Sequence, residues 1–228
     1  MKKKLLLLHG ALGSATSLQI LNELLSEYYE VYAYDFPGHG GKPFPEESLK
    51  MPVLTRHLHE YIREFHLTGC AVFGYSMGGY AALWLESKEQ GTFSQIMTLA
   101  TKFEWTPEIA DKEIALLNPE KMEQKIPSFV NSLQEMHAPN DWKKVVLETA
   151  LLLKHLGTNH LTSDDFGNIN CPVRIALGDV DQMVSIEETL RVFKEFPKSS
   201  LLVMPSTAHA LERVDLSYLK NEIHRFIH

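Results

Sequence analysis

The sequence contains few cysteines and no long hydrophobic segment. Its 228 residues include two cysteines, Cys70 and Cys171, which are too few to form the disulfide framework of a small secreted domain. Both stand at the start of expected strands, so we expect them to be reduced and to pack in the core. No segment approaches the ~20 consecutive apolar residues of a transmembrane helix. These absences favour a globular protein of the cytoplasm.

Long runs of positive charge are also absent. The formal net charge is −7, which argues against nucleic acids and anionic membranes as binding partners. Lys2–Lys4 precede Leu5–Leu8, an arrangement that superficially resembles a secretion signal. A signal peptide requires roughly 7–15 apolar residues, so we interpret the four leucines as a buried strand. The sequence gives no indication of the oligomeric state.

Metal and nucleotide signatures are missing as well. The 11 histidines and two cysteines do not fall at spacings typical of a zinc site. The glycines around Gly10 and Gly74 fit turns and do not form a phosphate-binding loop. We therefore expect neither a metal ion nor a cofactor.

The chain does contain an alternation of short apolar runs and amphipathic stretches, which is typical of parallel βαβ units. Most of the runs are apolar on both faces, as expected of strands that helices cover on both sides. The expected strands are Lys4–Leu8, Val31–Asp35, Cys70–Phe73, Gln95–Ala100, Val173–Leu177 and Leu201–Met204. The expected helices between them are Ala15–Glu27, Val53–His66, Met77–Ser87, Ser185–Phe196 and Leu216–Ile227. The predicted fold class is α/β.

This alternation is interrupted once, between the fourth and fifth expected strands. About 70 residues separate them, which is far more than a plain crossover requires. We therefore divide the chain into a core, residues 1–103 and 166–228, and an inserted helical cap, residues 104–165. Helices are expected in the cap at Pro107–Leu117, Pro119–Gln124, Ser128–Met136 and Asp141–Leu156. Its apolar residues are expected to pack on the core or face a site beneath the cap: Met122, Phe129, Met136, Trp142 and Leu151–Leu153.

The pentapeptide Gly74-Tyr75-Ser76-Met77-Gly78 lies between an expected strand and an expected helix. A serine in so sharp a turn must adopt strained backbone angles to expose its hydroxyl. Glycines two residues away on either side remove Cβ atoms that would collide at this corner. The helix that follows directs its first N–H groups toward the serine oxygen. This context predicts that Ser76 is a nucleophile.

A nucleophilic serine needs a base that accepts its proton and an acid that orients the base. His209 follows the last expected strand, at the sheet edge where open α/β folds bind ligands. Asp181 follows the fifth expected strand and is our choice for the acid, while Asp179 is expected to brace the turn. The chain order Ser76, Asp181, His209 is that of α/β-hydrolases and differs from the chymotrypsin and subtilisin orders.

With these residues the chain resembles the α/β-hydrolase superfamily everywhere except in the insertion. His9–Gly13 resembles the oxyanion loop of that family, and Asp35–Gly40 resembles its Asp-x-x-Gly-x-Gly turn. The resemblance implies an α/β-hydrolase fold with helices on both sides of the sheet and a helical cap. Because the sequence shows no antiparallel hairpin before the first expected strand, we expect about six strands, all parallel, in the order 2-1-3-4-5-6.

The resemblance also implies roles for particular residues. The oxyanion hole would consist of the backbone N–H groups of Ala11 and Met77, with Leu12 as the alternative to Ala11. Leu12 and Tyr75 are expected to contact the substrate. His9 is expected to brace the oxyanion loop, and Asp35 and His39 to stabilise the neighbouring turn. The insertion is short for the family, so we expect a modest or partly open pocket.

The leading hypothesis is a serine hydrolase that cleaves a small acyl substrate through an acyl-enzyme. A carboxylic ester is the default substrate, and a thioester or lactone would use much the same catalytic groups. One alternative is a C–C hydrolase or lyase that acts on a carboxylated metabolite, with the triad as base. A cation would then bind the carboxylate; the candidates are Lys102, Lys143 and Lys144, although each is expected at the solvated surface. Another alternative is a receptor-like member that binds its ligand with little turnover.

Overall fold

The computed structural model describes residues 2–227. The sheet within this range consists of β1 (Lys3–Leu8), β2 (Tyr29–Tyr34), β3 (Cys70–Tyr75), β4 (Phe93–Leu99), β5 (Val173–Gly178) and β6 (Ser199–Met204). The strand order is β2-β1-β3-β4-β5-β6, and every neighbouring pair is parallel. This confirms the predicted fold class and topology. All six expected strands are present, with ends shifted by at most two residues.

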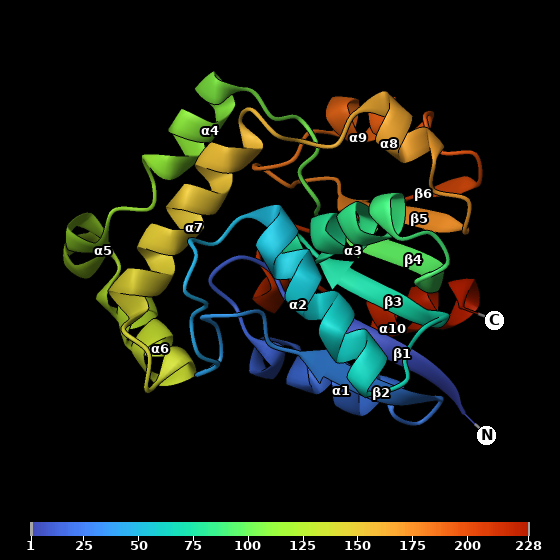
Figure 1. The fold of residues 1–228 in the computed structure, drawn as a ribbon, viewed down its shortest axis with the longest axis horizontal. Helices are drawn as coiled ribbons and strands as arrows, with labels where there is room; N and C mark the ends of the chain where they lie inside the picture. Colours follow the sequence, from blue (N-terminus) through green and yellow to red (C-terminus); the bar gives the residue numbers. More distant parts are fainter. Residues whose placement is uncertain (1, 228) are drawn as a thin grey trace.

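Helices cover both faces of the sheet (Figure 1). Leu5 and Leu7 of β1 pack in a cluster with α1 (Gln19–Leu25) and α10 (Leu216–Phe226). Leu6 and Leu8 point to the opposite face and pack in a cluster with α2 (Met51–Glu64) and α3 (Met77–Lys88). Successive side chains of a strand alternate between its two faces, so a strand of consecutive leucines serves both clusters. This is why β1 is apolar throughout.

Two helices differ from the predicted pattern. The expected helix Ala15–Glu27 begins as a 3-10 turn, η1 (Ala15–Leu18), and continues as α1. The first N–H of η1, that of Ala15, donates to the Asp35 carboxylate at 2.7 Å, which draws this turn toward the end of β2. The helix α8 (Ser163–Gly167) was not expected, because five residues are too few to show a helical period. The next helix along the chain, α9 (Ile186–Phe193), lies within the expected helix Ser185–Phe196.

The insertion forms α4 (Pro107–Ile114), α5 (Pro119–Lys125), α6 (Pro127–His137) and α7 (Trp142–Leu156). These helices lie together to one side of the sheet (Figure 1). Side chains of Thr106, Asn118 and Asp141 cap α4, α5 and α7. Prolines occupy the first turn of α4, α5 and α6. Such caps contribute roughly 1 kcal/mol each. They mark the start of three of the four helices, whereas α6 has no side-chain cap.

The cap has a small apolar core of its own, formed by Met122, Val130, Leu133, Trp142 and Val146. Of the seven apolar residues that we expected to pack on the core or face the site, Phe129 and Leu151 are instead 43% and 44% exposed. The helical period places Leu151 on the face of α7 opposite to Leu153. The division of the chain into core and cap remains our proposal.

Both cysteines are free thiols. Cys70 is buried as expected, whereas Cys171 is half-buried at the edge of the core. Burial raises the pKa of each thiol to about 12, so both stay protonated and weakly nucleophilic. None of the helices in residues 2–227 combines the length and the apolar character that crossing a membrane would require. The cytoplasmic location stays a prediction.

Candidate active site

Ser76 lies at the corner between β3 and α3. Its backbone has φ 51° and ψ −115°, a conformation that side-chain-bearing residues rarely adopt. Two hydrogen bonds fix the corner to β4 and the loop after it: Ser76 N–H donates to Leu99 O at 2.8 Å, and Thr101 Oγ1 donates to Ser76 O at 3.1 Å. Thr101 was not singled out from the sequence, although it directly follows the expected strand Gln95–Ala100.

The flanking glycines are required by close backbone approach. A Cβ on Gly74 would lie 2.4 Å from the backbone nitrogen of Gly79, and a Cβ on Gly78 would lie 2.4 Å from Leu8 O. Contacts this short are far inside van der Waals distance, and the atoms involved are backbone atoms that cannot move aside. The structure therefore agrees with the sequence-based argument that glycines at these two positions avoid a collision of Cβ atoms with the backbone.

His209 and Asp181 meet Ser76 at the carboxyl ends of the strands. The distance from Ser76 Oγ to His209 Nε2 is 3.4 Å, and His209 Nδ1 lies 2.9 Å from Asp181 Oδ2. Because a carboxylate accepts, His209 Nδ1–H donates to Asp181, and Nε2 is left free to accept from the serine hydroxyl. The serine contact is long, as catalytic hydrogen bonds often are before substrate binds.

The Asp181 side chain is fully buried and is held as a carboxylate. Burial by itself raises the pKa of this carboxyl, but hydrogen bonds from His209, Val184 and Met183 and the electrostatic interaction with His209 lower it below its usual value. Asp181 Oδ1 accepts the N–H groups of Met183 and Val184 at 2.8 and 2.9 Å. The carboxylate is thus fixed by its own loop and has one oxygen left for the histidine.

The loop that carries His209 is held at both sides. Tyr75 OH donates to His209 O at 2.7 Å, which ties the loop to the residue before the serine. Asp179 accepts the N–H of Thr207 at 3.2 Å, so it braces the turn as expected. The Tyr75 ring also packs against Gly10, since a Cβ there would lie 2.7 Å from a ring carbon. Tyr75 therefore connects the β3–α3 corner at Ser76, the loop that carries His209 and the loop that contains Gly10.

The loop His9–Gly13, which we expect to be the oxyanion loop, follows β1. His9 Nε2 accepts the N–H of Phe36 at 3.2 Å, so its Nδ1–H donates to Gly10 O at 2.8 Å. His39 Nδ1–H donates to Pro37 O at 3.0 Å, and the ring is fully buried. These contacts agree with the bracing roles that the resemblance implies for the two histidines.

A cavity of about 230 Å³ lies above Ser76. Six of the seven residues predicted for the site line it: Ala11, Leu12, Tyr75, Ser76, Met77 and His209. Asp181 lies behind His209 and does not line the cavity. The walls are mainly apolar and come from the sheet-forming part of the chain and from the insertion. The insertion contributes Leu152, Leu153 and Leu156 of α7. A cavity of this size agrees with the expected modest pocket.

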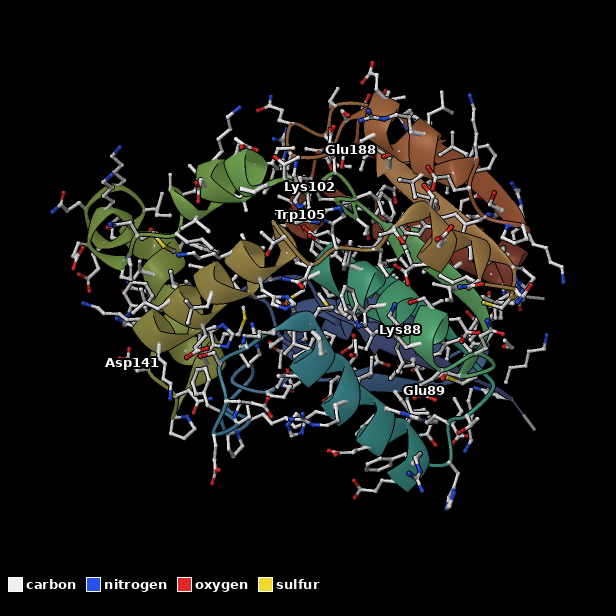
Figure 2. The ribbon with its side chains drawn as sticks, turned by 45° about the horizontal axis from the view of Figure 1, so that its top comes forward. Lys88, Glu89, Lys102, Trp105, Asp141 and Glu188 are labelled. Atoms are coloured by element: carbon white, nitrogen blue, oxygen red, sulfur yellow. The ribbon has the colours of Figure 1, made fainter. Side chains whose placement is uncertain are left out.

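One expected surface lysine belongs to the cavity wall instead. Lys102 lines the cavity, its side chain is 17% exposed, and its Nζ lies 3.4 Å from Glu113 Oε1. It also donates to Met183 O at 2.9 Å. Figure 2 shows Lys102 and Trp105 on the segment that leads from the sheet toward α4. By contrast, Lys143 is half exposed and pairs with Glu123, as the solvated interpretation predicts.

The rest of the site was not accessible from the sequence. Glu113 has no motif around it, and its role depends on how α4 lies over the cavity. Within residues 2–227, the His, Cys, Asp and Glu side chains form no group of three or more that could hold a metal ion. The site that the described residues form contains a serine, an imidazole, a carboxylate and a mainly apolar cavity whose wall also holds the Lys102–Glu113 pair.

The sequence profile of the alpha/beta hydrolase family matches residues 5–215. The chain belongs to the alpha/beta hydrolase family. A protein of Haemophilus influenzae that bears the name of an esterase/lipase is 28% identical over 79 residues. That match covers 35% of this alpha/beta hydrolase and 27% of the relative, so the chain aligns with about a quarter of that protein.

Solved structures show the same fold across the whole alpha/beta hydrolase. An esterase from Thermogutta terrifontis has a TM-score of 0.81 at 18% identity, covering 100% of this chain and 90% of that one. An enol-lactonase from Burkholderia xenovorans has a TM-score of 0.80 at 14% identity, with 100% and 92% covered. A 2-hydroxy-6-oxo-6-phenylhexa-2,4-dienoate hydrolase from Rhodococcus has a TM-score of 0.79 at 16% identity, with 99% and 90% covered. At these identities the likeness concerns the fold alone.

Proposed function

We propose that this alpha/beta hydrolase is a serine esterase for small, neutral acyl groups. The observation that carries the proposal is the hydrogen-bonded series Ser76–His209–Asp181 at the floor of an apolar cavity. A serine hydroxyl becomes a nucleophile only beside a base that is itself oriented, and the three side chains supply these roles in order.

The reaction follows from the orientation of the histidine. Ser76 Oγ attacks the ester carbonyl carbon while its proton moves to His209 Nε2, and the carbonyl electron pair moves onto the oxygen. Collapse of this intermediate breaks the ester C–O bond, and His209 returns the proton to the departing alcohol. Water then attacks the acyl-enzyme, again giving its proton to His209. The acid leaves, and Ser76 regains its proton. Asp181 stabilises the imidazolium throughout.

The oxyanion would be bound by backbone N–H groups at two places. Met77 is the first residue of α3, where N–H groups have no acceptor within the helix and the dipole favours negative charge. Ala11 and Leu12 line the same cavity as Ser76, and either could supply the second donor. Donors of this kind contribute about 3 kcal/mol each to the transition state.

The cavity favours an aliphatic acyl group of short to medium length. Its walls next to Ser76 are leucines of α7, and apolar walls reward the burial of methylene groups. A volume of about 230 Å³ holds roughly seven or eight groups the size of a water molecule, at ~30 Å³ each. We therefore propose esters of acids up to about the size of octanoate as substrates.

A second candidate, C–C bond hydrolysis or a lyase reaction on a carboxylated metabolite, is favoured by one observation. Lys102 brings an ammonium group into the cavity wall. Its charge is already balanced by Glu113 and its Nζ donates to Met183 O, so a substrate carboxylate would have to compete for it. This pairing is the reason we rank the neutral ester first.

Ester hydrolysis is tested with a fluorophosphonate probe and a series of p-nitrophenyl esters from acetate to octanoate. We expect the wild-type protein to be labelled and to turn over the esters, and Ser76→Ala to lose both properties. His209→Gln is expected to lower kcat by several orders of magnitude. Turnover of carboxylated ketones in preference to all esters would favour the second candidate. Saturable binding without turnover or labelling would favour a receptor-like member and contradict the proposal.

A further inference from the structure

Three histidine side chains are fully buried around the oxyanion loop: His9, His39 and His137. The rings of His9 and His39 are 5.2 Å apart, and those of His39 and His137 are 5.6 Å apart. His9 and His39 belong to segments that directly follow strands of the core. His137 comes from the last residue of α6, in the cap. It was not considered in the sequence analysis, and the proposed reaction does not use it.

The two ring nitrogens of His137 have different partners. Nδ1 lies 3.1 Å from the backbone nitrogen of Gly40, which can only donate, so Nδ1 is the acceptor. The proton therefore resides on Nε2, which donates to Leu12 O at 3.1 Å. One neutral imidazole thus joins the oxyanion loop to the Asp35–Gly40 turn, and only one tautomer satisfies both contacts.

The residue that His137 holds is under backbone strain. Leu12 has φ 59°, a left-handed conformation that a leucine rarely adopts unless its surroundings impose it. Its side chain packs against the small core of the cap, and its carbonyl accepts from His137. Both contacts come from the cap. The core contributes a bond on the other side, from His9 to Gly10 O.

Burial supports a neutral ring at this position. It lowers the pKa of the His137 imidazole below its usual value, although the hydrogen bond to Leu12 acts in the opposite direction. A protonated ring would turn an N–H at Nδ1 toward the N–H of Gly40 and lose that contact. The neutral form is therefore the one that holds the loop.

We propose that His137 is a positioning residue for the oxyanion hole: its Nε2–H holds Leu12 O and so fixes the N–H groups of Ala11 and Leu12 toward Ser76. This role rests on the proposed serine hydrolase function. Leu12 O belongs to the same peptide unit as the N–H of Gly13, which donates to Gly10 O at 3.1 Å. By holding this unit, His137 fixes the Gly10–Gly13 turn that carries the N–H groups of Ala11 and Leu12. The cap thereby completes a site whose nucleophile and base belong to the core.

A purely structural role for the same contacts is separable, because a neighbouring residue attaches the cap without touching Leu12. Asn140 Nδ2 donates to Gly38 O at 3.1 Å and to Lys42 O at 2.8 Å. It therefore anchors the connection between α6 and α7 to the turn alone. Asn140→Ala is the matched control for loss of cap attachment.

The test compares two conservative variants that each keep one half of the bridge. His137→Gln retains an N–H donor at the position of Nε2, whereas His137→Asn retains an acceptor at the position of Nδ1. For p-nitrophenyl butyrate we expect His137→Asn to lower kcat by about 10- to 100-fold with KM within about threefold, since oxyanion contacts form in the transition state. We expect His137→Gln to stay within about fivefold of wild-type kcat and Asn140→Ala within about twofold. The melting temperature of each variant is measured in parallel.

Some outcomes overturn this role. If His137→Gln and His137→Asn lose kcat equally, or if kcat of all three variants follows the melting temperature, His137 only stabilises the cap. If wild-type turnover is present and His137→Asn keeps wild-type kcat, the contact to Leu12 is irrelevant to catalysis. A wild-type protein without Ser76-dependent turnover would overturn the proposed function first, and the role of His137 with it.

Discussion

Glu113 on α4 and Lys102 in the loop after β4 form an ion pair inside the cavity above Ser76, with 3.4 Å between Oε1 and Nζ. Both side chains are 17% exposed. The backbone next to Lys102 is fixed by α9, because Glu188 accepts the N–H of Phe103 at 3.0 Å. The pair connects α4 to the loop after β4 at the wall of the cavity. It also decides whether the cavity presents a free positive charge.

Removal of the Glu113 charge is expected to convert the cavity into a site for carboxylated substrates. In Glu113→Gln, the Lys102 ammonium lacks its counter-charge in a largely apolar wall. A charge-assisted hydrogen bond contributes roughly 1.5–3 kcal/mol, so KM for a monoester of a dicarboxylic acid should fall by about tenfold or more. KM for the neutral ester of equal length should stay within about twofold.

The control for this prediction is Glu123→Gln, which removes the partner of the half-exposed Lys143. Exposed ion pairs contribute little, and this one does not line the cavity. Its KM values should match those of the wild type. An equal change of KM for charged and neutral esters in Glu113→Gln would show that the pair does not control charge selectivity.

The length of acyl chain is expected to be limited by α7. Leu153 lines the cavity, whereas Leu151 is 44% exposed on the same helix. Leu153→Trp should lower kcat/KM for octanoate esters by about tenfold or more and leave acetate esters within about twofold, because each excluded methylene costs roughly 1–3 kcal/mol. Leu151→Trp should retain the wild-type chain-length profile. A profile unchanged in both variants would place the acyl chain elsewhere.

Mild acid is expected to destabilise the fold through the buried histidines. Burial lowers the pKa of His9 from its usual 6.5 to about 4, against the hydrogen bond to Gly10 O, which raises it. Below pH 6.5 His9 therefore binds a proton in the unfolded chain but stays neutral in the folded protein. The free energy of unfolding falls as the pH is lowered to about 4. The loss from His9 is about 3 kcal/mol, and burial of His39 acts in the same direction.

Urea unfolding at intervals between pH 7.5 and pH 4 measures this effect. Above pH 6.5 both states hold a neutral ring, so His9 makes no contribution to the pH dependence there. A free energy of unfolding that is flat from pH 6.5 to pH 4 would contradict the lowered pKa.

Gly74 and Gly78, which flank Ser76, are not expected to tolerate replacement by alanine. Gly78→Ala brings a Cβ within 2.4 Å of Leu8 O, and overpacking of this kind costs about 1–3 kcal/mol or more. The shift that relieves it moves the β3–α3 corner, so labelling of Ser76 should slow as well. Gly167→Ala is the control, since nothing lies within 4 Å of its added Cβ. Equal stability of the two variants in urea unfolding would refute the steric argument.

Much of the fold and site was predictable because it depends on neighbours along the chain. The strands were recognised from apolar runs whose alternation places leucines on both faces, as in β1. Ser76, Asp181 and His209 were found because each stands at the carboxyl end of a strand, and parallel strands bring those ends to one edge. Their order along the chain was then enough to propose the triad that the geometry brings together.

The remaining parts depend on how the cap packs on the core, which no local pattern encodes. His137 meets Leu12 across 125 positions of the sequence, and Glu113 reaches Lys102 only because α4 lies over the cavity. A lysine in a loop is solvated by default, so burial of Lys102 had no local signal. The sequence thus specified the proposed reacting groups through local turns and strand ends. The long-range packing of α4, α6 and α7 determined the shape and charge of the cavity.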